Sequence, residues 1–354
     1  MDLALYGEGG FYTAGGQAGR RGDFITSPEV GPLFGAVLAN MLDSVWRDLG
    51  EPSTLTIVDA GAGPGTLARS IRAAQPACLD AIDYIAVEVS EQQRAVHPDW
   101  VTSVDSMPTE PVVGVIIANE LLDNLAFRLF VMDGGWREAY VMSRPDGTFA
   151  EILRHAADVD QLALPGVQTH GSRVPVQQRA AAWVRAQRAL LDAGKMLLID
   201  YATASTVGLA KRPWREWLRT YRGHEHGVHY LREPGSQDIT VEVAIDQIIV
   251  ASGEPSSART QRQFLQRWGI DELVAEGHQV WSEQAARPTV AALTMRSRIR
   301  EAEALCDPNG LGAFTVLEFD AEVRPKRQLR HRPANGDSRS PMRSMRPGSL
   351  ELAR

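Results

Sequence analysis

The feature that most constrains this chain is an apolar run that ends in an acid and continues directly into a glycine-rich turn. Residues 55–59 read Leu-Thr-Ile-Val-Asp, and Ala-Gly-Ala-Gly-Pro-Gly follows. A second apolar run, residues 84–87, ends in Glu88. Two strands that end in acids, with a glycine turn that opens a helix after the first, are typical of a nucleotide-binding α/β sheet. We therefore expect a cofactor at the carboxyl ends of these strands.

The turn glycines are Gly61, Gly63 and Gly65. A strand that turns sharply into a helix, and lets a ligand lie against its backbone, has no room for β-carbons there. A nicotinamide dinucleotide site has its third glycine three residues after the second, where this chain has Thr66. The spacing therefore favours a different cofactor, although NAD, FAD or a tight turn without a cofactor stay open at this point.

With Asp59 at the end of the first strand, the pattern resembles the S-adenosylmethionine (SAM) site of class I methyltransferases. In such sites the early acid lies near the amino-acid end of the cofactor, and the acid that ends the second strand takes the ribose hydroxyls. The resemblance assigns these two roles to Asp59 and Glu88.

Composition sets the bounds on the rest of the chain. With 354 residues, 44% of them hydrophobic and 23% charged, the chain is long enough for a full α/β core and a smaller insertion. Its two cysteines, Cys78 and Cys306, exclude a disulfide framework and a thiolate metal cluster. Residues 1–10 lack a secretory pattern, and no run approaches the ~20 apolar residues of a membrane span. These observations predict a cytoplasmic protein without a membrane span.

The net charge of −7 is distributed unevenly. Residues 324–354 hold nine Lys or Arg against Asp337 and Glu351, a net charge of +7, which leaves −14 on residues 1–323. This basic tail has little apolar periodicity, so we expect it to be disordered, either as a solvated extension or as a contact for an acidic partner or nucleic acid. The acidic body argues against nucleic acid as the main substrate and favours a basic polypeptide.

A long amphipathic helix is predicted ahead of the glycine motif, because apolar residues from Val30 to Leu49 recur at helical spacing. Ser27 as N-cap and Pro28 at the first helical position indicate its start, and Gly50 its end. Capping is a sufficient explanation of Thr26 and Ser27. The glycine-rich residues 15–22 before it are typical of a mobile lid.

A third acidic group follows the apolar run of residues 111–118. Ligands of open α/β sheets lie beyond the carboxyl ends of the strands, so Asn119, Glu120 and Asp123 are expected in the crevice that holds Asp59 and Glu88. Helix capping is the alternative interpretation of these side chains.

Further along the chain, turn signals predict an antiparallel meander over residues 127–153 and a helix over 176–192. A strand is predicted over residues 195–201, and the sheet is completed by helices and a strand at 314–319. The segment 202–238 is rich in Arg, His and Gly, and a loop of this length is usually functional or disordered. We interpret His224 in it as an active-site or loop-ordering residue, because the spacing to His226 and His229 gives only a weak metal signal.

Taken together, these segments resemble the MidA family, whose mitochondrial members are protein arginine methyltransferases needed to assemble respiratory complex I. The resemblance extends from Leu5 to Phe319. It is carried, in order, by residues 10–12, Gly22-Asp23-Phe24-Ile-Thr-Ser-Pro-Glu29, the glycine motif, Val87-Glu88, Asn119-Glu120-Leu-Leu-Asp123, Asp200-Tyr201, Arg222-Gly223-His224, Pro234-Gly235, Asp238-Ile-Thr240 and residues 264–270. The family commonly has Asp-Ala where this chain has Asp123-Asn124.

The resemblance implies a SAM-dependent methyltransferase that acts on arginine of a protein partner, with a respiratory complex subunit as a candidate. The alternatives are a small-molecule methyltransferase and a SAM-binding assembly chaperone without turnover. Carboxylates can position a guanidinium and accept its proton, so Glu120 is the first choice as catalytic residue and Asp123 the second, with Asp23 and Asp200 weaker. The full set of expected site residues is Glu120, Asp123 and His224 for catalysis, and Asp23, Phe24, Thr26, Asp59, Gly61, Gly63, Gly65, Thr66, Glu88 and Asn119 for SAM, with no metal.

The predicted fold is therefore a class I, Rossmann-like α/β sheet with an inserted antiparallel meander and extra helices. The expected divisions of the chain are an N-terminal lid and helix (1–50), a SAM-binding core (51–126), the meander (127–175), the remainder of the core with a substrate loop at 202–240 (176–323), and the basic tail (324–354).

Overall fold

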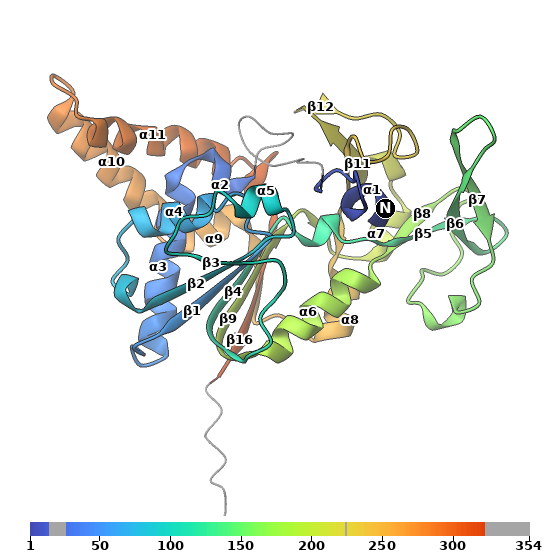
Figure 1. The fold of residues 1–354 in the computed structure, drawn as a ribbon, viewed down its shortest axis with the longest axis horizontal. Helices are drawn as coiled ribbons and strands as arrows, with labels where there is room; N and C mark the ends of the chain where they lie inside the picture. Colours follow the sequence, from blue (N-terminus) through green and yellow to red (C-terminus); the bar gives the residue numbers. More distant parts are fainter. Residues whose placement is uncertain (14–25, 224, 323–354) are drawn as a thin grey trace, which may run out of the picture. The chain divides into compact units, whose positions relative to one another are not determined.

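A seven-stranded, mostly parallel sheet forms the centre of the computed structural model, which describes residues 1–13, 26–223 and 225–322 (Figure 1). The strand order is β15-β16-β9-β4-β1-β2-β3. Strands β9, β4, β1, β2 and β3 are parallel, whereas β16 is antiparallel to both of its neighbours. The strands are β1 (Leu55–Ala60), β2 (Ile82–Val87), β3 (Thr102–Val104), β4 (Val112–Asn119), β9 (Leu191–Asp200), β15 (Ser257–Thr260) and β16 (Thr315–Ala321). The predicted Rossmann-like sheet is confirmed.

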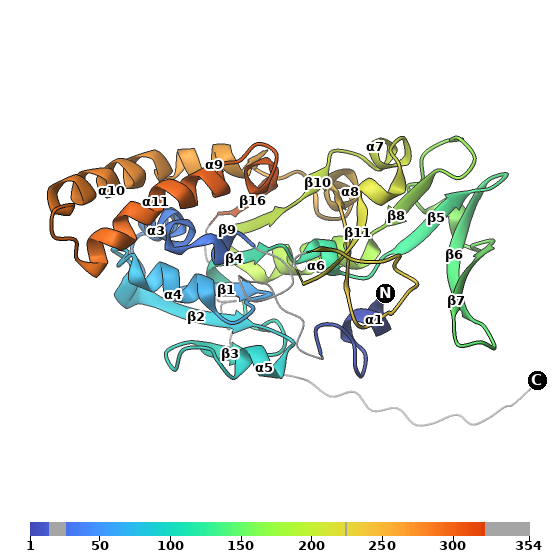
Figure 2. The ribbon, with the colours of Figure 1, turned by 90° about the horizontal axis from the view of Figure 1, so that it is seen from above.

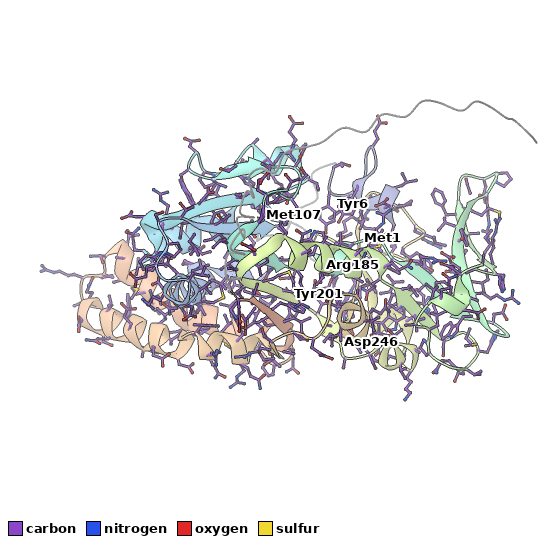
Figure 3. All side chains as sticks on the ribbon, turned by 90° about the horizontal axis from the view of Figure 1, so that it is seen from below. Met1, Tyr6, Met107, Arg185, Tyr201 and Asp246 are labelled. Carbon is purple, nitrogen blue, oxygen red and sulfur yellow. The ribbon has the colours of Figure 1, made fainter. Side chains whose placement is uncertain are left out.

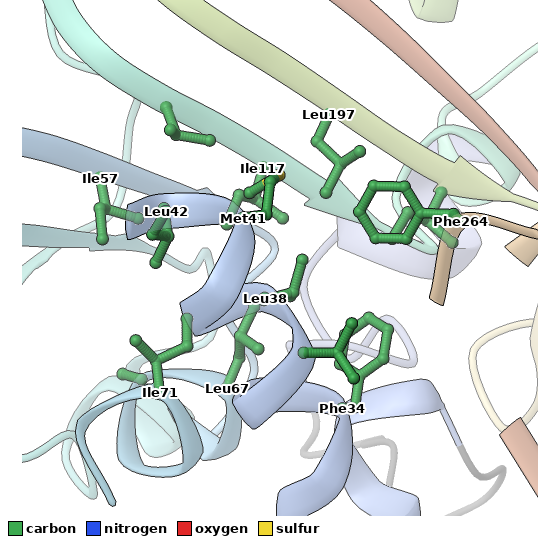
Figure 4. Close-up of a cluster of buried hydrophobic side chains, with 14 of the residues drawn as sticks. Phe34, Leu38, Met41, Leu42, Ile57, Leu67, Ile71, Ile117, Leu197 and Phe264 are labelled. Carbon is green, nitrogen blue, oxygen red and sulfur yellow. The ribbon is translucent and has the colours of Figure 1, made fainter. Parts of the chain in front are cut away.

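Helices cover both faces of this sheet (Figure 2). Side chains alternate along each strand, so Ile57 and Ile117 face one layer of helices while Val58 and Ile116 face the other. Figure 4 shows the first of these cores, where Phe34, Leu38 and Met41 pack against the sheet. The first layer contains α3 (Pro32–Asp48), α4 (Thr66–Ala73), α9 (Gln261–Arg267) and the paired α10 (Ile270–Gln284) and α11 (Val290–Leu305); the second contains α6 (Gln178–Leu190) and α8 (Ile245–Ser252).

The helix predicted from residue 27 onward is broken near its start. Helix α2 (Ser27–Val30) is followed by Gly31, and α3 begins at Pro32. Proline has no backbone N–H and disfavours helical backbone in the residue before it, which explains the interruption. Ser27 was expected to be the N-cap, but Thr26 holds that position and the Ser27 hydroxyl instead donates to Gln261 Oε1 at 2.8 Å.

A second, antiparallel sheet follows β4 in the chain, in the strand order β7-β6-β5-β8. It contains the expected meander, β5 (Arg128–Met132), β6 (Trp136–Ser143) and β7 (Phe149–Arg154), and adds β8 (Arg173–Val176). One of its outer strands, β8, therefore comes from a part of the chain that the turn signals did not pair.

The segment predicted as a long loop, residues 202–238, contains several short regular elements in its described part, whereas residues 227–237 are turns and irregular backbone. It contains β10 (Ala202–Thr203), α7 (Thr206–Ala210), β11 (Leu218–Arg222) and β12 (Glu225–His226), and β11 pairs with β13 (Asp238–Val241). Strand β14 (Val243–Ala244) follows and pairs with β10. The prediction of an irregular loop is wrong for residues 202–222, where Trp217 is fully buried in an apolar cluster that also contains Leu5, Phe11 and Val241.

The remaining elements are short: α1 (Asp2–Tyr6), α5 (Glu91–Arg94) and the 3-10 turns η1 (Leu79–Ala81), η2 (Leu122–Asn124), η3 (Val159–Gln161), η4 (Trp214–Glu216) and η5 (Leu311–Ala313). The cluster around Trp217 includes residues of α1, so the described N-terminal segment packs close to β13. Among the described residues, no helix has both the length and the apolar character that crossing a membrane requires.

Candidate active site

The glycine turn after β1 adopts backbone conformations that favour glycine. Gly61, Gly63 and Gly65 have φ angles of +74°, +54° and +79°. A β-carbon on Gly63 would stand 3.3 Å from Gln93 Oε1, in a stretch of backbone that lines a cavity. The turn therefore presents bare backbone to whatever occupies that cavity.

Glu88, the residue after β2, is buried and connected to this turn. Its Oε2 accepts a hydrogen bond from the Gly63 N–H at 3.0 Å, and its Oε1 accepts one from the Ser90 N–H at 2.8 Å. A carboxylate has about four lone-pair positions, so these two bonds orient Glu88 and leave acceptor capacity for a ligand.

His97 supports the same turn and was not anticipated from the sequence. Its Nε2 lies 2.7 Å from the Gly63 carbonyl oxygen, and its Nδ1 lies 2.8 Å from Ser103 Oγ. Because a carbonyl only accepts, Nε2 carries a proton, and in the neutral ring Nδ1 then accepts from the serine. A β-carbon at Gly65 would also approach this ring, at 3.2 Å, so Gly65 serves the turn geometry and its own backbone does not line the cavity.

Asp59, near the end of β1, is buried next to the same cavity. Its Oδ2 accepts a hydrogen bond from the Tyr84 hydroxyl at 2.9 Å. Burial raises the pKa of Asp59 to about 7, against the lowering effect of the Tyr84 hydrogen bond. A carboxyl in this state gains from a cationic ligand, because a nearby positive charge favours its ionised form.

The cavity beyond the strand ends has a volume of about 410 Å³. It is lined by eight of the residues expected from the sequence: Thr26, Asp59, Gly61, Gly63, Thr66, Glu88, Asn119 and Glu120. The expected residues Asp23, Phe24 and His224 lie outside the described part of the chain.

Glu120 follows β4 and has a φ angle of +53°, a left-handed conformation that non-glycine residues adopt infrequently. Its Oε1 accepts from the Ser27 N–H at 3.3 Å and from Asn119 Nδ2 at 3.1 Å. Burial, with Asp123 as a neighbouring negative charge, raises the pKa of Glu120 to about 8. A carboxyl with a pKa near neutrality can both hold and release a proton under working conditions.

Asp123, the second catalytic candidate, lies in the structure behind the cavity wall. Its carboxyl accepts hydrogen bonds from the hydroxyls of Tyr201 and Thr240, and it does not line the cavity. Asp200 Oδ2 accepts hydrogen bonds from the backbone N–H groups of Leu122 and Asp123, at 3.0 and 3.3 Å. These bonds hold turn η2 in place. Burial raises the pKa of both carboxyls.

Several lining residues were missed by the sequence interpretation. Asp105, Ser106 and Met107 follow β3, and the rule that ligands lie beyond strand ends was sufficient to find them. Tyr6 and Tyr12 also line the cavity, but no local signal connects them to it, because their partners lie more than a hundred residues away. Tyr6 and Met107 are both labelled in Figure 3.

Comparisons with known proteins define the class. A family model described as "Putative S-adenosyl-L-methionine-dependent methyltransferase" matches residues 37–263. The solved structure of a COG1565 superfamily member from Burkholderia thailandensis, bound to S-adenosyl-homocysteine, is similar over 92% of this chain and 87% of that chain, with 26% identity and a TM-score of 0.77. The protein is thus a class I methyltransferase with SAM as its cofactor. The chain belongs to the matched family.

Two curated relatives are similar in sequence. The mitochondrial protein arginine methyltransferase NDUFAF7 of Danio rerio is 27% identical over 307 residues, which is 74% of this chain and 70% of the relative. Its Drosophila melanogaster homolog is 26% identical over 279 residues, 67% of this chain and 61% of the relative. The expectation of a cytoplasmic protein is wrong on this comparison, because these relatives are named as mitochondrial.

The residues present fit SAM. The turn at Gly63 leaves open the space that a β-carbon would take, and Glu88 keeps acceptor capacity for ribose hydroxyls. The side-chain oxygen of Asn119, buried at the edge of the same cavity, has no hydrogen-bond partner among the described residues. A ligand that donates a hydrogen bond would satisfy it.

Proposed function

We propose that this methyltransferase transfers its methyl group to an arginine of a protein partner. The observation that carries the proposal is Glu120, a cavity-lining carboxyl whose pKa is raised to about 8. It follows β4, the strand that pairs with β1, which leads into the glycine turn. The names of the curated relatives, protein arginine methyltransferases, support the same acceptor.

SAM is held, in this proposal, by the backbone of Gly61 and Gly63 and by side chains around the turn. Glu88 accepts from the ribose hydroxyls, and Asp59 lies near the amino-acid end of the cofactor, where its carboxyl faces a positive charge. Gly65 shapes the turn, and Thr26, Thr66 and Asn119 complete the contacts. Asp23 and Phe24 belong to the same proposed set.

The bound cofactor supplies a methyl group on a sulfonium: the acceptor nitrogen forms the new N–C bond as the C–S bond breaks, and sulfur keeps the bonding electrons. Glu120 pairs with the guanidinium in the ground state, because carboxylates bind that group through parallel hydrogen bonds. The guanidinium has a pKa above ~12, so its nitrogen loses a proton only to a positioned base. Glu120 accepts that proton, and the methylated product remains a cation.

Asp123 and Asp200 act indirectly in this scheme. They hold the turn η2 that carries Asn124, and their hydrogen bonds run through Tyr201, Thr240 and the backbone. We assign them as positioning residues. His224 is proposed as a further active-site residue on the resemblance alone. For the domain divisions, we propose those expected from the sequence, with residues 202–240 on the acceptor side.

The partner is proposed to be a basic polypeptide, with a respiratory complex subunit as the first to test on the family resemblance. Residues 1–323 carry a net charge of −14, which favours a basic polypeptide as partner and disfavours nucleic acid as the main substrate.

The test is labelled transfer. The protein is incubated with methyl-labelled SAM and candidate subunits, and the intact mass and fragment masses of each subunit locate the label. Label on an arginine, lost in Glu120→Gln, supports the proposal. Label on another residue or on a small molecule contradicts it, and binding of SAM without any transfer would favour an assembly chaperone.

A further inference from the structure

Asn124 is a buried residue whose side-chain oxygen meets no partner in the part of the chain that the structure describes. It ends the turn η2, four residues after Glu120, and its side chain is 6% exposed. It lines the cavity together with Glu120. Its Oδ1 has no hydrogen-bond partner among the described residues. A buried amide oxygen in this state is costly unless a ligand donates to it.

The orientation of this amide is fixed by a directed series of hydrogen bonds. The Tyr12 hydroxyl donates its proton to Asp238 Oδ1 at 3.1 Å. A phenol has a single proton, so its oxygen can then only accept, and Asn124 Nδ2 donates to it at 2.6 Å. The amide nitrogen of Asn124 therefore faces Tyr12, and the oxygen is the part left for a ligand.

Two tyrosines contact Asn124 through their hydroxyls. The Tyr6 hydroxyl donates to the Asn124 backbone carbonyl at 3.2 Å. The Tyr6 and Tyr12 rings stack on each other, with centroids 5.5 Å apart and an interplanar angle of 18°, and both residues line the cavity. Aromatic rings attract cations through their quadrupoles.

A second acceptor of this cavity is the carboxyl of Glu120. Both hydrogen bonds that the Glu120 carboxyl receives from described residues end on Oε1. A guanidinium next to Glu120 favours the ionised carboxylate, which only accepts. Asn124 Oδ1 and this carboxylate then both offer acceptors to the cavity, where a neutral ligand with its own acceptor atoms would be poorly matched. A guanidinium is planar and positively charged, and it has five N–H donors and no acceptor.

We propose that Asn124 Oδ1, with Glu120 and the Tyr6–Tyr12 pair, forms the subsite that selects a guanidinium as methyl acceptor. The inference rests on the proposed function and adds the residue that sets its specificity. The informative comparison is between the binding of arginine and of citrulline, whose side chain has a carbonyl oxygen in place of one nitrogen of the guanidinium. Citrulline presents an acceptor and no charge to a subsite built from acceptors.

The experiment is a calorimetric titration of the protein saturated with S-adenosyl-homocysteine, using acetyl-arginine amide and acetyl-citrulline amide as probes. We expect the wild type to bind the arginine probe about ten-fold or more tightly than the citrulline probe, the scale of a lost hydrogen bond to a charged group. Asn124→Leu, of similar size, should reduce this preference several-fold while its affinity for S-adenosyl-homocysteine stays unchanged.

Tyr12→Phe separates recognition from a merely structural role. Without the hydroxyl, the Asn124 amide can turn its nitrogen toward the cavity, so affinity for arginine should fall while affinity for citrulline rises. If Asn124 only anchors Tyr12, the variant should weaken both probes equally. Tyr140→Phe is the matched control, because it removes a hydroxyl that also donates to a carboxyl, Glu138 Oε2 at 3.1 Å, and Tyr140 does not line this cavity.

Equal binding of the two probes by the wild type, no binding of either, or an unchanged preference in Asn124→Leu would overturn the subsite. The proposed function fails on a different result, namely labelled methyl groups found on an acceptor other than arginine. Labelled arginine with an unchanged probe preference in Asn124→Leu would therefore overturn the subsite alone.

Discussion

The backbone N–H of Gly63 donates a hydrogen bond to Glu88, with 3.0 Å between the nitrogen and Oε2. This contact connects the turn after β1 with the end of β2, the two segments whose pattern first indicated a nucleotide site. Glu88 also accepts from Ser90, so its carboxyl is oriented from both sides before any ligand arrives. A ligand hydroxyl then meets an acceptor that needs little reorganisation.

Glu88→Ala should weaken SAM binding by about 1.5–3 kcal/mol, because hydrogen bonds to a charged acceptor are lost. The turn at Gly63 also loses a support, which acts in the same direction. Titration calorimetry with S-adenosyl-homocysteine measures the effect. Glu91→Ala, an exposed acid in α5, is the control. Unchanged affinity in Glu88→Ala would remove the second strand from the cofactor site.

Gly63→Val should abolish SAM binding. A branched side chain at a φ of +54° is strained, and it enters the space next to Gln93 on the cavity side. Gly134→Val is a matched control, because its φ is +64° and a β-carbon there meets nothing within 4 Å. It shares the backbone strain without touching the cavity. NAD should not bind the wild type, because Thr66 occupies the position of a dinucleotide-site glycine.

Deletion of residues 324–354 should leave the melting temperature and SAM affinity unchanged. The expectation comes from sequence, since this segment is basic and poor in apolar residues and has little to contribute to a core. Thermal unfolding of the shortened and full chains, followed by titration, is the measurement. A large drop in melting temperature would show that the domain boundary at residue 323 is wrong.

Asp59, Glu88 and Glu120 were predictable as cavity residues because each stands at or directly after the carboxyl end of a parallel strand, and the sheet topology brings those ends together. The same rule failed for Asp123. It lies one 3-10 turn further on, where the chain has folded back, and its carboxyl is directed at Tyr201 and Thr240.

The position of the Tyr6–Tyr12 pair at the cavity could not be predicted from local sequence patterns, for a different reason. Tyr12 is joined to Asn124 and Asp238 through side chains that are 112 and 226 residues away in the chain. Local patterns carry no information about such contacts. The irregular appearance of residues 202–222 was also misleading, because the burial of Trp217 depends on tertiary packing that composition does not reveal.

Glu120→Gln should lower methyl transfer by about 100-fold, the scale of a lost acid-base group. SAM affinity should stay close to that of the wild type, because Glu120 acts on the acceptor. Single-turnover transfer and titration separate the two effects. Glu110→Gln, an exposed acid before the opposite end of β4, is the control. Parallel losses of binding and rate would instead make Glu120 a cofactor ligand.

Glu120 should also make the free protein less stable as pH rises. Its pKa is about 8 in the folded protein, against an ordinary value of 4.5, so the folded state binds more protons between these values. The stability present below about pH 4.5 is therefore lost progressively as pH rises through about 8. Asp59, with a pKa of about 7 against 3.8, adds a loss of the same sign.

Melting temperatures measured from about pH 4.5 to above pH 8 test this pH dependence of stability. Glu120→Gln should flatten the decline, because an amide does not titrate, and Asp59→Asn should flatten its lower part. A residual slope is expected from Asp123 and Asp200, whose pKa values burial also raises. Glu110→Gln should follow the wild type throughout. If Glu120→Gln fell in parallel with the wild type, Glu120 would be ionised in the folded protein well below pH 8, and its assignment as a base poised near neutrality would fail.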